Sequence, residues 1–123
     1  KKVDLYCDDP AVASARFKID DAVIDGVFLT RDLVNMPPND LYPESYAAKI
    51  KKDLALPGLK IEVLDDKKLK SMGFGAHLAV GQGSIRPPRV VVMEWNGPAT
   101  GTKSGTKAKT RPLALVGKGI TFD

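Results

Sequence analysis

The chain ends in the stretch Pro112-Leu113-Ala114-Leu115-Val116-Gly117-Lys118-Gly119-Ile120-Thr121-Phe122-Asp123. Its apolar run, residues 113–116, is typical of a short strand buried on both faces, as in the interior of a covered sheet. The run leads into two glycines around Lys118, where the backbone is free to turn sharply or to approach a ligand closely. In open α/β sheets, ligands bind beyond the carboxyl ends of the strands. We therefore expect the loop after this strand to lie at a ligand-binding edge. A natural domain rarely ends so soon after such a turn, so we also expect the chain to be a piece of a longer protein.

The segments before this strand predict two helices. Asp9-Pro10 is a helix start, with Asp9 as N-cap and Pro10 at the first helical position. Apolar or small residues then recur three and four positions apart over residues 12–33, until Pro37-Pro38 ends the helix. A second helix is expected to begin at Pro43 and to end before Pro57-Gly58.

The middle of the chain predicts two more strands and a short helix. Apolar and charged residues alternate over residues 59–63, which indicates a strand near a sheet edge. Asp65-Asp66 should cap a short helix closed by Gly73, and the apolar residues 76–80 are too few to assign. Residues 90–95 form a second interior strand, expected to lie beside residues 113–116. The order α, α, β, α, β, β suits an α/β fold, an αβα sandwich with a mixed sheet.

Composition and charge narrow the functional classes. Hydrophobic content of 43% and charged content of 28% are ordinary for a soluble globular protein. No apolar run approaches the roughly 18 residues that a membrane span needs, so no membrane partner is expected. The single cysteine, Cys7, excludes an internal disulfide framework and favours a reducing compartment.

The net charge of +4 comes from segment 97–111, which has four basic residues and no acidic one: Lys103, Lys107, Lys109 and Arg111. The segment is rich in glycine and threonine and has no interleaved aromatic residue, so we expect a solvated, mobile loop. The alternative is a DNA-binding or scaffolding role in which this segment contacts phosphates.

Three blocks of sequence carry a family resemblance, and they occur in order over residues 31–123. The first is Arg31-Asp32-Leu33-Val34-Asn35-Met36-Pro37, the second runs from Gly73-Phe74-Gly75 to Gly81-Gln82-Gly83-Ser84, and the third is Leu115-Val116-Gly117-Lys118-Gly119-Ile120-Thr121-Phe122-Asp123. Together they resemble the leucyl aminopeptidase family, the M17 metallopeptidases. The resemblance implies that the chain is the front part of the C-terminal catalytic domain of a cytosolic enzyme. The N-terminal domain and the rest of the catalytic domain would lie outside it.

The resemblance also implies a chemistry. Lys118 and Asp123 would be ligands of two divalent ions, zinc or manganese, which activate a water for attack on the peptide bond after an N-terminal residue, leucine among them. The family's catalytic lysine and arginine would lie beyond residue 123, so no catalytic residue is expected within the chain. Two ligands cannot fill two coordination spheres of about four each, and we expect the chain alone to be inactive. Peptides are the expected substrates, the cytoplasm the expected location and a homo-hexamer the expected assembly.

The same turn predicts a geometry. Lys118 and Asp123 are five residues apart, so a continuous strand would place them on opposite faces and roughly 16 Å apart. Metal ions about 4 Å apart could not be reached that way. If both residues are ligands, the backbone must leave the strand path near Gly119, the residue with no side chain to resist an unusual angle. We therefore expect residues 119–122 to break the strand direction, and the Lys118 amine and the Asp123 carboxylate to converge beyond the end of the strand.

Other candidate residues favour structural roles. Gly119 stands where a phosphate-binding loop needs a hydroxyl, and Arg86 replaces the last glycine of a dinucleotide fingerprint, so Gly81 and Gly83 are expected to serve backbone turning. His77 is the only histidine, which excludes a histidine-rich zinc site within the chain. The remaining polar candidates are expected to cap helices, to form structural hydrogen bonds or to lie at a sheet edge: Asp65 and Asp66, then Arg31, Asp32 and Asn35, then Glu94.

Overall fold

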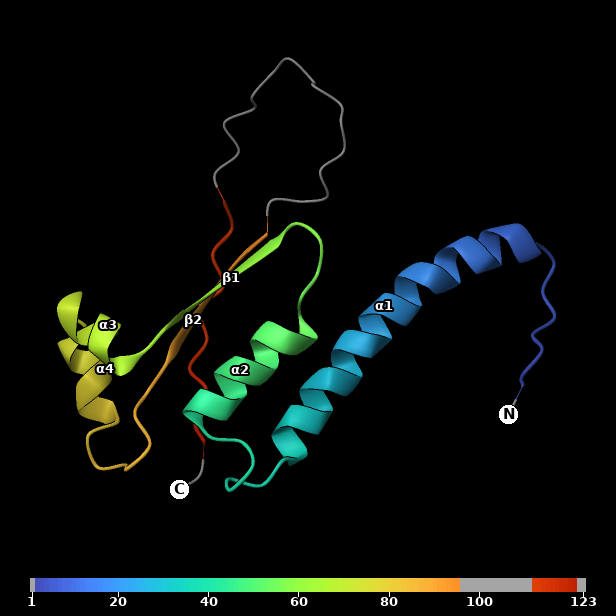
Figure 1. The fold of residues 1–123 in the computed structure, drawn as a ribbon. Coiled ribbons are helices and arrows are strands. Elements are labelled where there is room, and N and C mark those ends of the chain that lie inside the picture. Colours follow the sequence, from blue (N-terminus) through green and yellow to red (C-terminus); the bar gives the residue numbers. More distant parts are fainter. Residues whose placement is uncertain (1, 96–111, 122–123) are drawn as a thin grey trace, which may run out of the picture. The chain divides into compact units, whose positions relative to one another are not determined.

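A computed structural model of the chain describes residues 2–95 and 112–121. The chain divides into two compact units, Lys1–Met36 and Pro37–Asp123, and each is described by itself. Figure 1 shows the elements, which are α1 (Pro10–Asn35), α2 (Pro43–Asp53), β1 (Leu59–Leu64), α3 (Asp66–Ser71), α4 (Gly75–Val80) and β2 (Val90–Trp95).

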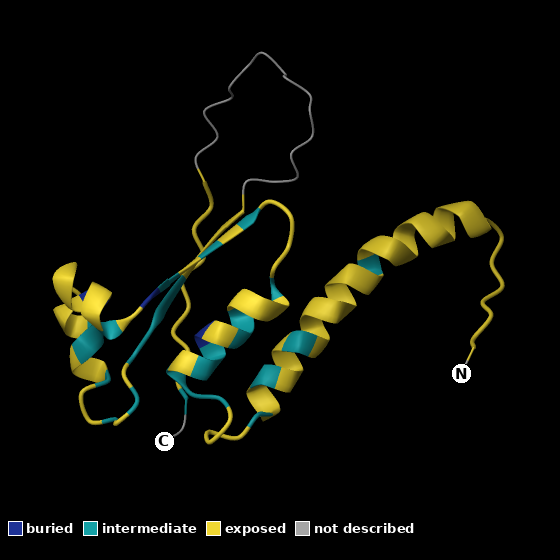
Figure 2. Cartoon of the chain, viewed as in Figure 1, coloured by how far each residue is buried: buried dark blue, intermediate teal, exposed yellow. Residues whose placement is uncertain are grey.

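The first unit consists of α1 and the residues that flank it. The Asp9 carboxylate accepts hydrogen bonds from the backbone N–H groups of Ala11 and Val12, at 3.1 and 3.0 Å, and Pro10 occupies the first turn. The helix ends before Pro37, as predicted. No residue of α1 is buried, so its apolar stripe has no cover within the first unit, and Figure 2 shows the helix exposed over almost its whole length.

The sheet of the second unit has two antiparallel strands. β1 pairs with β2 in a register that runs from Leu59 opposite Trp95 to Leu64 opposite Val90. Along β1 the residues alternate between more and less exposed positions, as its sequence predicts. Lys60 and Glu94 are opposite each other, and their charged groups lie 4.0 Å apart on the solvent side. The described residues therefore have an α/β fold with this antiparallel pair as its sheet.

The predictions for the last strand were wrong. Residues 113–116 belong to no strand, and the described neighbour of β2 is β1 rather than this segment. The side chains of Leu113, Leu115 and Val116 are exposed, Val116 by 97%. A strand forms only where a neighbouring strand pairs with its backbone N–H and C=O groups, and no described strand pairs with residues 113–116. No described element covers their side chains either, so these remain in solvent. The mixed sheet is not formed by the described residues.

The core of the second unit is small, and two of its buried residues lie on β1 and α3, which contact each other. Of the described residues only Ala47, Leu64 and Leu69 are buried, and Leu69 is fully so. Figure 2 shows this scarcity of buried positions. The Asp65 carboxylate caps α3 by accepting a hydrogen bond from the Lys68 N–H at 2.8 Å, and Gly73 follows the helix with a φ of 78°. Asp65 and Gly73 thus bound α3 as predicted.

Two further expectations concern membrane-spanning helices and the basic segment 97–111. Among residues 2–95 and 112–121, no helix is both long enough and apolar enough to cross a membrane. Segment 97–111, expected to be a mobile loop or a DNA contact, lies outside the described residues.

Candidate functional site

Lys118 lies in an extended segment, residues 112–121, that contains no helix or strand. Its side chain is exposed, and within the described residues it forms no hydrogen bond or ion pair. Its predicted partner, Asp123, lies outside the described residues. Within the part of the chain that the structure describes, no three His, Cys, Asp or Glu side chains gather as a metal would require. Lys118 is therefore an available donor, and the described residues by themselves do not complete a metal site.

Gly119 does not have a positive φ: among the described glycines only Gly58 and Gly73 do, at 83° and 78°. The predicted convergence of Lys118 with Asp123 lies partly outside the described residues and stays a prediction. Gly119 lies near α2: a methyl group placed on it would be 3.6 Å from Cε1 of the Tyr46 ring. That is the distance at which an added side chain would begin to touch the ring. Sequence reasoning did not predict that the segment carrying Lys118 passes near Tyr46.

The start of α2 is fixed by a cluster of contacts around Tyr42. The Arg86 guanidinium lies 4.0 Å from the centre of the Tyr42 ring, and its Nη1 donates a hydrogen bond to the Pro38 carbonyl at 2.6 Å. The Ser45 hydroxyl accepts a hydrogen bond from the Tyr42 N–H at 3.0 Å and donates to the Asp40 carbonyl at 2.7 Å. A cation over an aromatic face and charge-assisted hydrogen bonds both stabilise such a junction. We call these contacts the Arg86 clamp.

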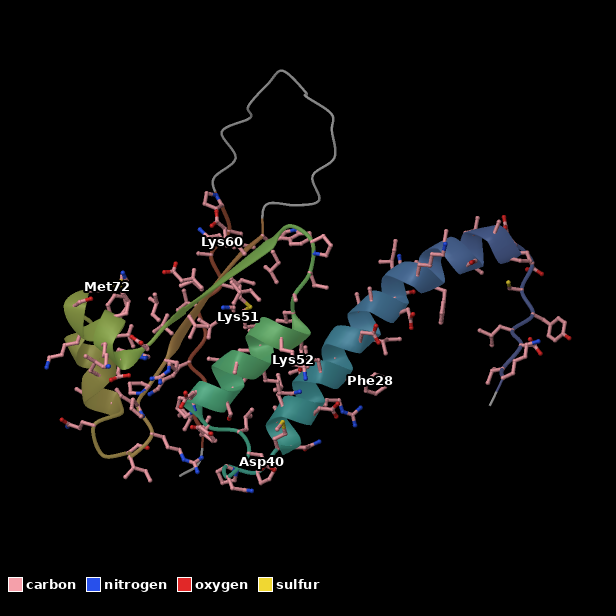
Figure 3. The ribbon with its side chains drawn as sticks, viewed as in Figure 1. Phe28, Asp40, Lys51, Lys52, Lys60 and Met72 are labelled. Carbon is pink, nitrogen blue, oxygen red and sulfur yellow. The ribbon has the colours of Figure 1, made fainter. Side chains whose placement is uncertain are left out.

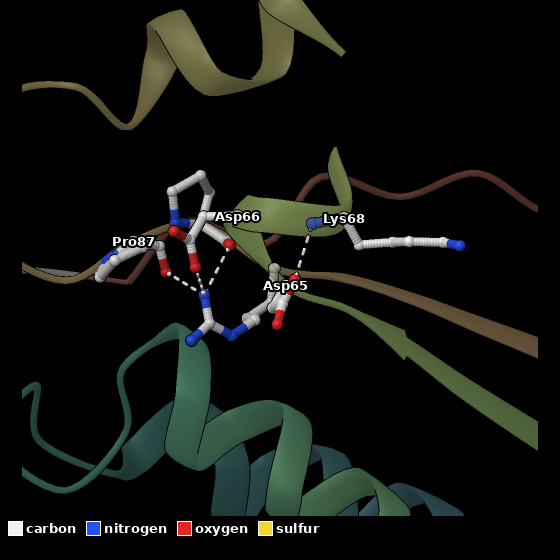
Figure 4. A network of polar contacts seen from close by, with 6 residues as sticks. Asp65, Asp66, Lys68 and Pro87 are labelled. Carbon is white, nitrogen blue, oxygen red and sulfur yellow. Dashed lines mark hydrogen bonds and ion pairs between the residues drawn. The ribbon is translucent and has the colours of Figure 1, made fainter. Parts of the chain in front are cut away.

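The loop before β2 contains two arginines, Arg86 and Arg89, that both form hydrogen bonds within the second unit. In the network of Figure 4, Nη1 of Arg89 donates to the Asp66 carboxylate at 3.2 Å and to the carbonyls of Pro87 and Pro88. The Arg86 N–H donates to the Ser84 hydroxyl at 3.0 Å. The Arg89 side chain is only 14% exposed, whereas Arg16, in the ion pair with Asp20 on α1, is 73% exposed, so the Arg89–Asp66 pair is better shielded from solvent.

Gly81 has a role in this loop that differs from the predicted one. Its φ is −89°, which any residue adopts, so it is not required for backbone turning. A Cβ at this position would lie 2.9 Å from Cδ and 3.0 Å from Cγ of Pro88. The glycine therefore permits a close approach of the chain to a rigid proline ring.

Gly81→Ala should destabilise the second unit by about 1–3 kcal/mol, because the added methyl must displace the Pro88 ring or its own backbone. Gly83→Ala is the matched control: no atom lies within 4 Å of the place that its methyl group would take, and it should be neutral or slightly stabilising. Urea unfolding of the chain, followed by Trp95 fluorescence, measures both. Equal midpoints for the two variants would contradict the close-approach argument.

The remaining acidic and histidine candidates behave structurally. Asp65 caps α3, and Asp66, the first residue of that helix, pairs with Arg89. The Glu94 side chain is 57% exposed and faces Lys60, in agreement with an exposed sheet position. His77 is half-buried in α4, and its Nε2 has no hydrogen-bond partner within the described residues.

The candidates on α1 differ from expectation. Arg31, Asp32 and Asn35 are all exposed, and Arg31 lies 6.0 Å from the ring centre of Phe28, which Figure 3 labels. Neither Asp32 nor Asn35 forms a side-chain hydrogen bond within the described residues. The predicted structural hydrogen bonds are thus not formed within the first unit, because these side chains face solvent there.

Comparison with known proteins decides the family. A model of the "Cytosol aminopeptidase family, catalytic domain" matches residues 28–123. The chain belongs to the cytosol aminopeptidase family. The matched range contains the three blocks of the predicted resemblance, which is thereby confirmed.

Several relatives support this assignment. The chain is 47% identical over its whole length to a probable cytosol aminopeptidase of Chelativorans sp. (strain BNC1), of which it covers 23%. It is 49% identical over 94% of its length to one of Methylorubrum extorquens, of which it covers 22%. The chain thus spans less than a quarter of the length of these relatives. No solved structure matches it.

Proposed function

We propose that the chain is the front part of the catalytic domain of a metal-dependent aminopeptidase that releases N-terminal residues, with leucine preferred, from peptides. We use "intact protein" for this chain joined to the remaining length that its relatives have. In the intact protein we propose a cytoplasmic homo-hexamer, with a catalytic domain built as an αβα sandwich with a mixed sheet.

One observation carries this proposal: the catalytic-domain model matches through both Lys118 and Asp123. The structure supports the role of Lys118, because its amine is exposed and has no competing acidic partner within the described residues. A lysine amine can bind a metal ion only after it has lost its proton, and binding of a divalent ion favours that loss. The chain would supply Lys118 and Asp123, and residues beyond it would complete the ligand set. Two divalent ions held there would supply an activated water for peptide hydrolysis.

The test compares the intact protein with the chain alone, using leucine p-nitroanilide as substrate. The intact protein should hydrolyse it, should lose activity after dialysis against a chelator and should regain it with zinc or manganese. The chain of residues 1–123 should show no hydrolysis with or without metal, because two ligands cannot hold two ions. Hydrolysis by the purified chain, with contaminating enzymes excluded, would contradict the proposal, as would an intact protein that is indifferent to chelation.

A further inference from the structure

We propose that one apolar side of α1 is a docking surface for the part of the intact protein that lies outside residues 1–123. The surface is formed by Phe17, Ile24 and Phe28, which we call the Phe17 stripe. Its occupant is an apolar surface that is bordered by basic side chains and belongs to the same polypeptide rather than to a second copy. The inference goes beyond the proposed function, because it requires neither a metal ion nor peptidase activity.

The Phe17 stripe is a continuous row along one side of the helix. An α-helix has 3.6 residues per turn, so residues 4, 7 or 11 positions apart lie within about 40° of each other around its axis. Phe17, Ile24 and Phe28 have these spacings. The opposite side of α1 carries the longer apolar row, which includes Ile19 and Leu33. A surface helix of a single domain needs only one apolar side, so a helix with two is expected to be covered by two bodies.

The stripe has no cover within the first unit. No residue of α1 is buried, Phe17 and Phe28 are each more than half exposed, and Ile24 is 44% exposed. Figure 3 labels Phe28, whose ring projects away from the helix. Single apolar residues are common on protein surfaces, whereas a contiguous exposed patch marks an interaction site. The continuous row on α1 therefore calls for a partner.

The comparisons indicate where the partner comes from. The catalytic-domain model matches residues 28–123 and so begins inside α1, whereas the Chelativorans relative aligns with the whole chain. The greater part of α1 thus has a counterpart in a probable cytosol aminopeptidase, outside the matched catalytic domain. The chain covers only 23% of that relative, so most of the intact polypeptide lies outside residues 1–123. This remaining length is the body that we assign to the stripe.

Charge beside the stripe indicates the chemistry of the partner. Asp21, Asp25 and Asp32, which we call the acid row, share the same helical spacings and lie about 60° around the axis from the stripe. All three are exposed and form no ion pair within the described residues. Carboxylates one turn apart repel each other, and basic side chains along this edge would relieve the repulsion. A second copy docked through the same stripe would add another acid row to the contact, so charge disfavours self-pairing.

The experiment replaces Phe17 of the intact protein by p-benzoylphenylalanine, an aromatic residue that forms cross-links to neighbouring C–H bonds on illumination. Mass spectrometry identifies the cross-linked peptide. The protein is assembled from an equal mixture of light and isotope-labelled copies, which separates cross-links within one copy from those between copies. We expect a cross-link within one copy, to a peptide outside residues 1–123. If the variant at Phe17 does not fold, the same replacement at Phe28 gives the same reading.

Lys18 is the matched control position, because it is exposed on α1 but lies about 100° around the axis from Phe17. The same probe at Lys18 should give a severalfold lower yield of this cross-link. Equal yields at the two positions would mean that the helix is enclosed on all sides and would overturn the assignment of the stripe. A cross-link to residues 37–121, a cross-link between light and heavy copies, or no cross-link from the stripe would overturn the choice of occupant.

The basic border has a test of its own in the same protein. Asp21→Lys combined with Asp25→Lys should lower the yield of the Phe17 cross-link severalfold, and the uncharged pair Asp21→Asn with Asp25→Asn should lower it less. An unchanged yield in the lysine variant would refute the basic border. None of these readouts measures zinc binding or hydrolysis, so failure of the inference and failure of the proposed function are told apart.

Discussion

Leu69→Ala should destabilise the second unit by about 2–5 kcal/mol, the range for truncating a fully buried leucine. Leu69 has no exposed surface, and only Ala47 and Leu64 join it among the buried residues that the structure describes. Typical domains are stable by only about 5–15 kcal/mol, and a unit with so small a core is expected near or below the lower end of that range. The variant should therefore be largely unfolded, because Leu64 is the only other large side chain in the described core.

Urea unfolding followed by fluorescence measures this effect, since Trp95 on β2 is the only tryptophan of the chain. Leu115→Ala is the matched control: the same atoms are removed from a side chain that is 89% exposed, and the change should stay within about 0.5 kcal/mol. Similar losses for the two variants would show that the core does not centre on Leu69.

The sequence predicted best where local stereochemistry decides the structure. The bounds of α1 depend on Asp9, Pro10 and the Pro37-Pro38 pair, whose effects on the backbone act within a few residues. β1 was predictable because its alternation marks one shielded face. The six residues of α4 were not assigned, since so short a run does not distinguish a helical period from another.

The errors arose where a residue pattern specifies an environment but not the partner that provides it. The apolar run at residues 113–116 is typical of a strand buried on both faces, but no described residue buries it. Gly81 shows the same ambiguity on a smaller scale. A glycine fits either a positive φ or a close approach, and only the position of Pro88 shows that the second applies here.

The surroundings of the candidate site were not predictable at all. Arg86 contacts the Pro38 carbonyl across 48 positions of sequence, and no periodicity or spacing links such residues. No pattern predicts either that Gly119 passes near the Tyr46 ring. Lys118 itself could be singled out, but from the family blocks rather than from its own surroundings, which are those of an exposed lysine.

The largest effect on function is expected from Lys118→Ala in the intact protein. Residues that merely orient a ligand change metal affinity or activity by about 10–100-fold, so removing a ligand should lower zinc affinity by about 100-fold or more. Hydrolysis of leucine p-nitroanilide should fall at least as far at limiting zinc. Lys51→Ala is the matched control, because Lys51 is also exposed, on α2, where Figure 3 labels it, and both zinc affinity and hydrolysis should be unchanged.

Lys118→Arg distinguishes a ligand from a positive charge. A guanidinium stays protonated in proteins and has no lone pair to offer a metal, whereas it preserves the charge and much of the length of lysine. If Lys118 binds metal, the arginine variant should be as defective as the alanine variant in both zinc affinity and hydrolysis. If Lys118 acts only through its charge, arginine should restore most of the activity. Rescue by arginine would therefore refute metal ligation by Lys118. Equal loss in both variants would agree with ligation and would contradict a role of the charge alone.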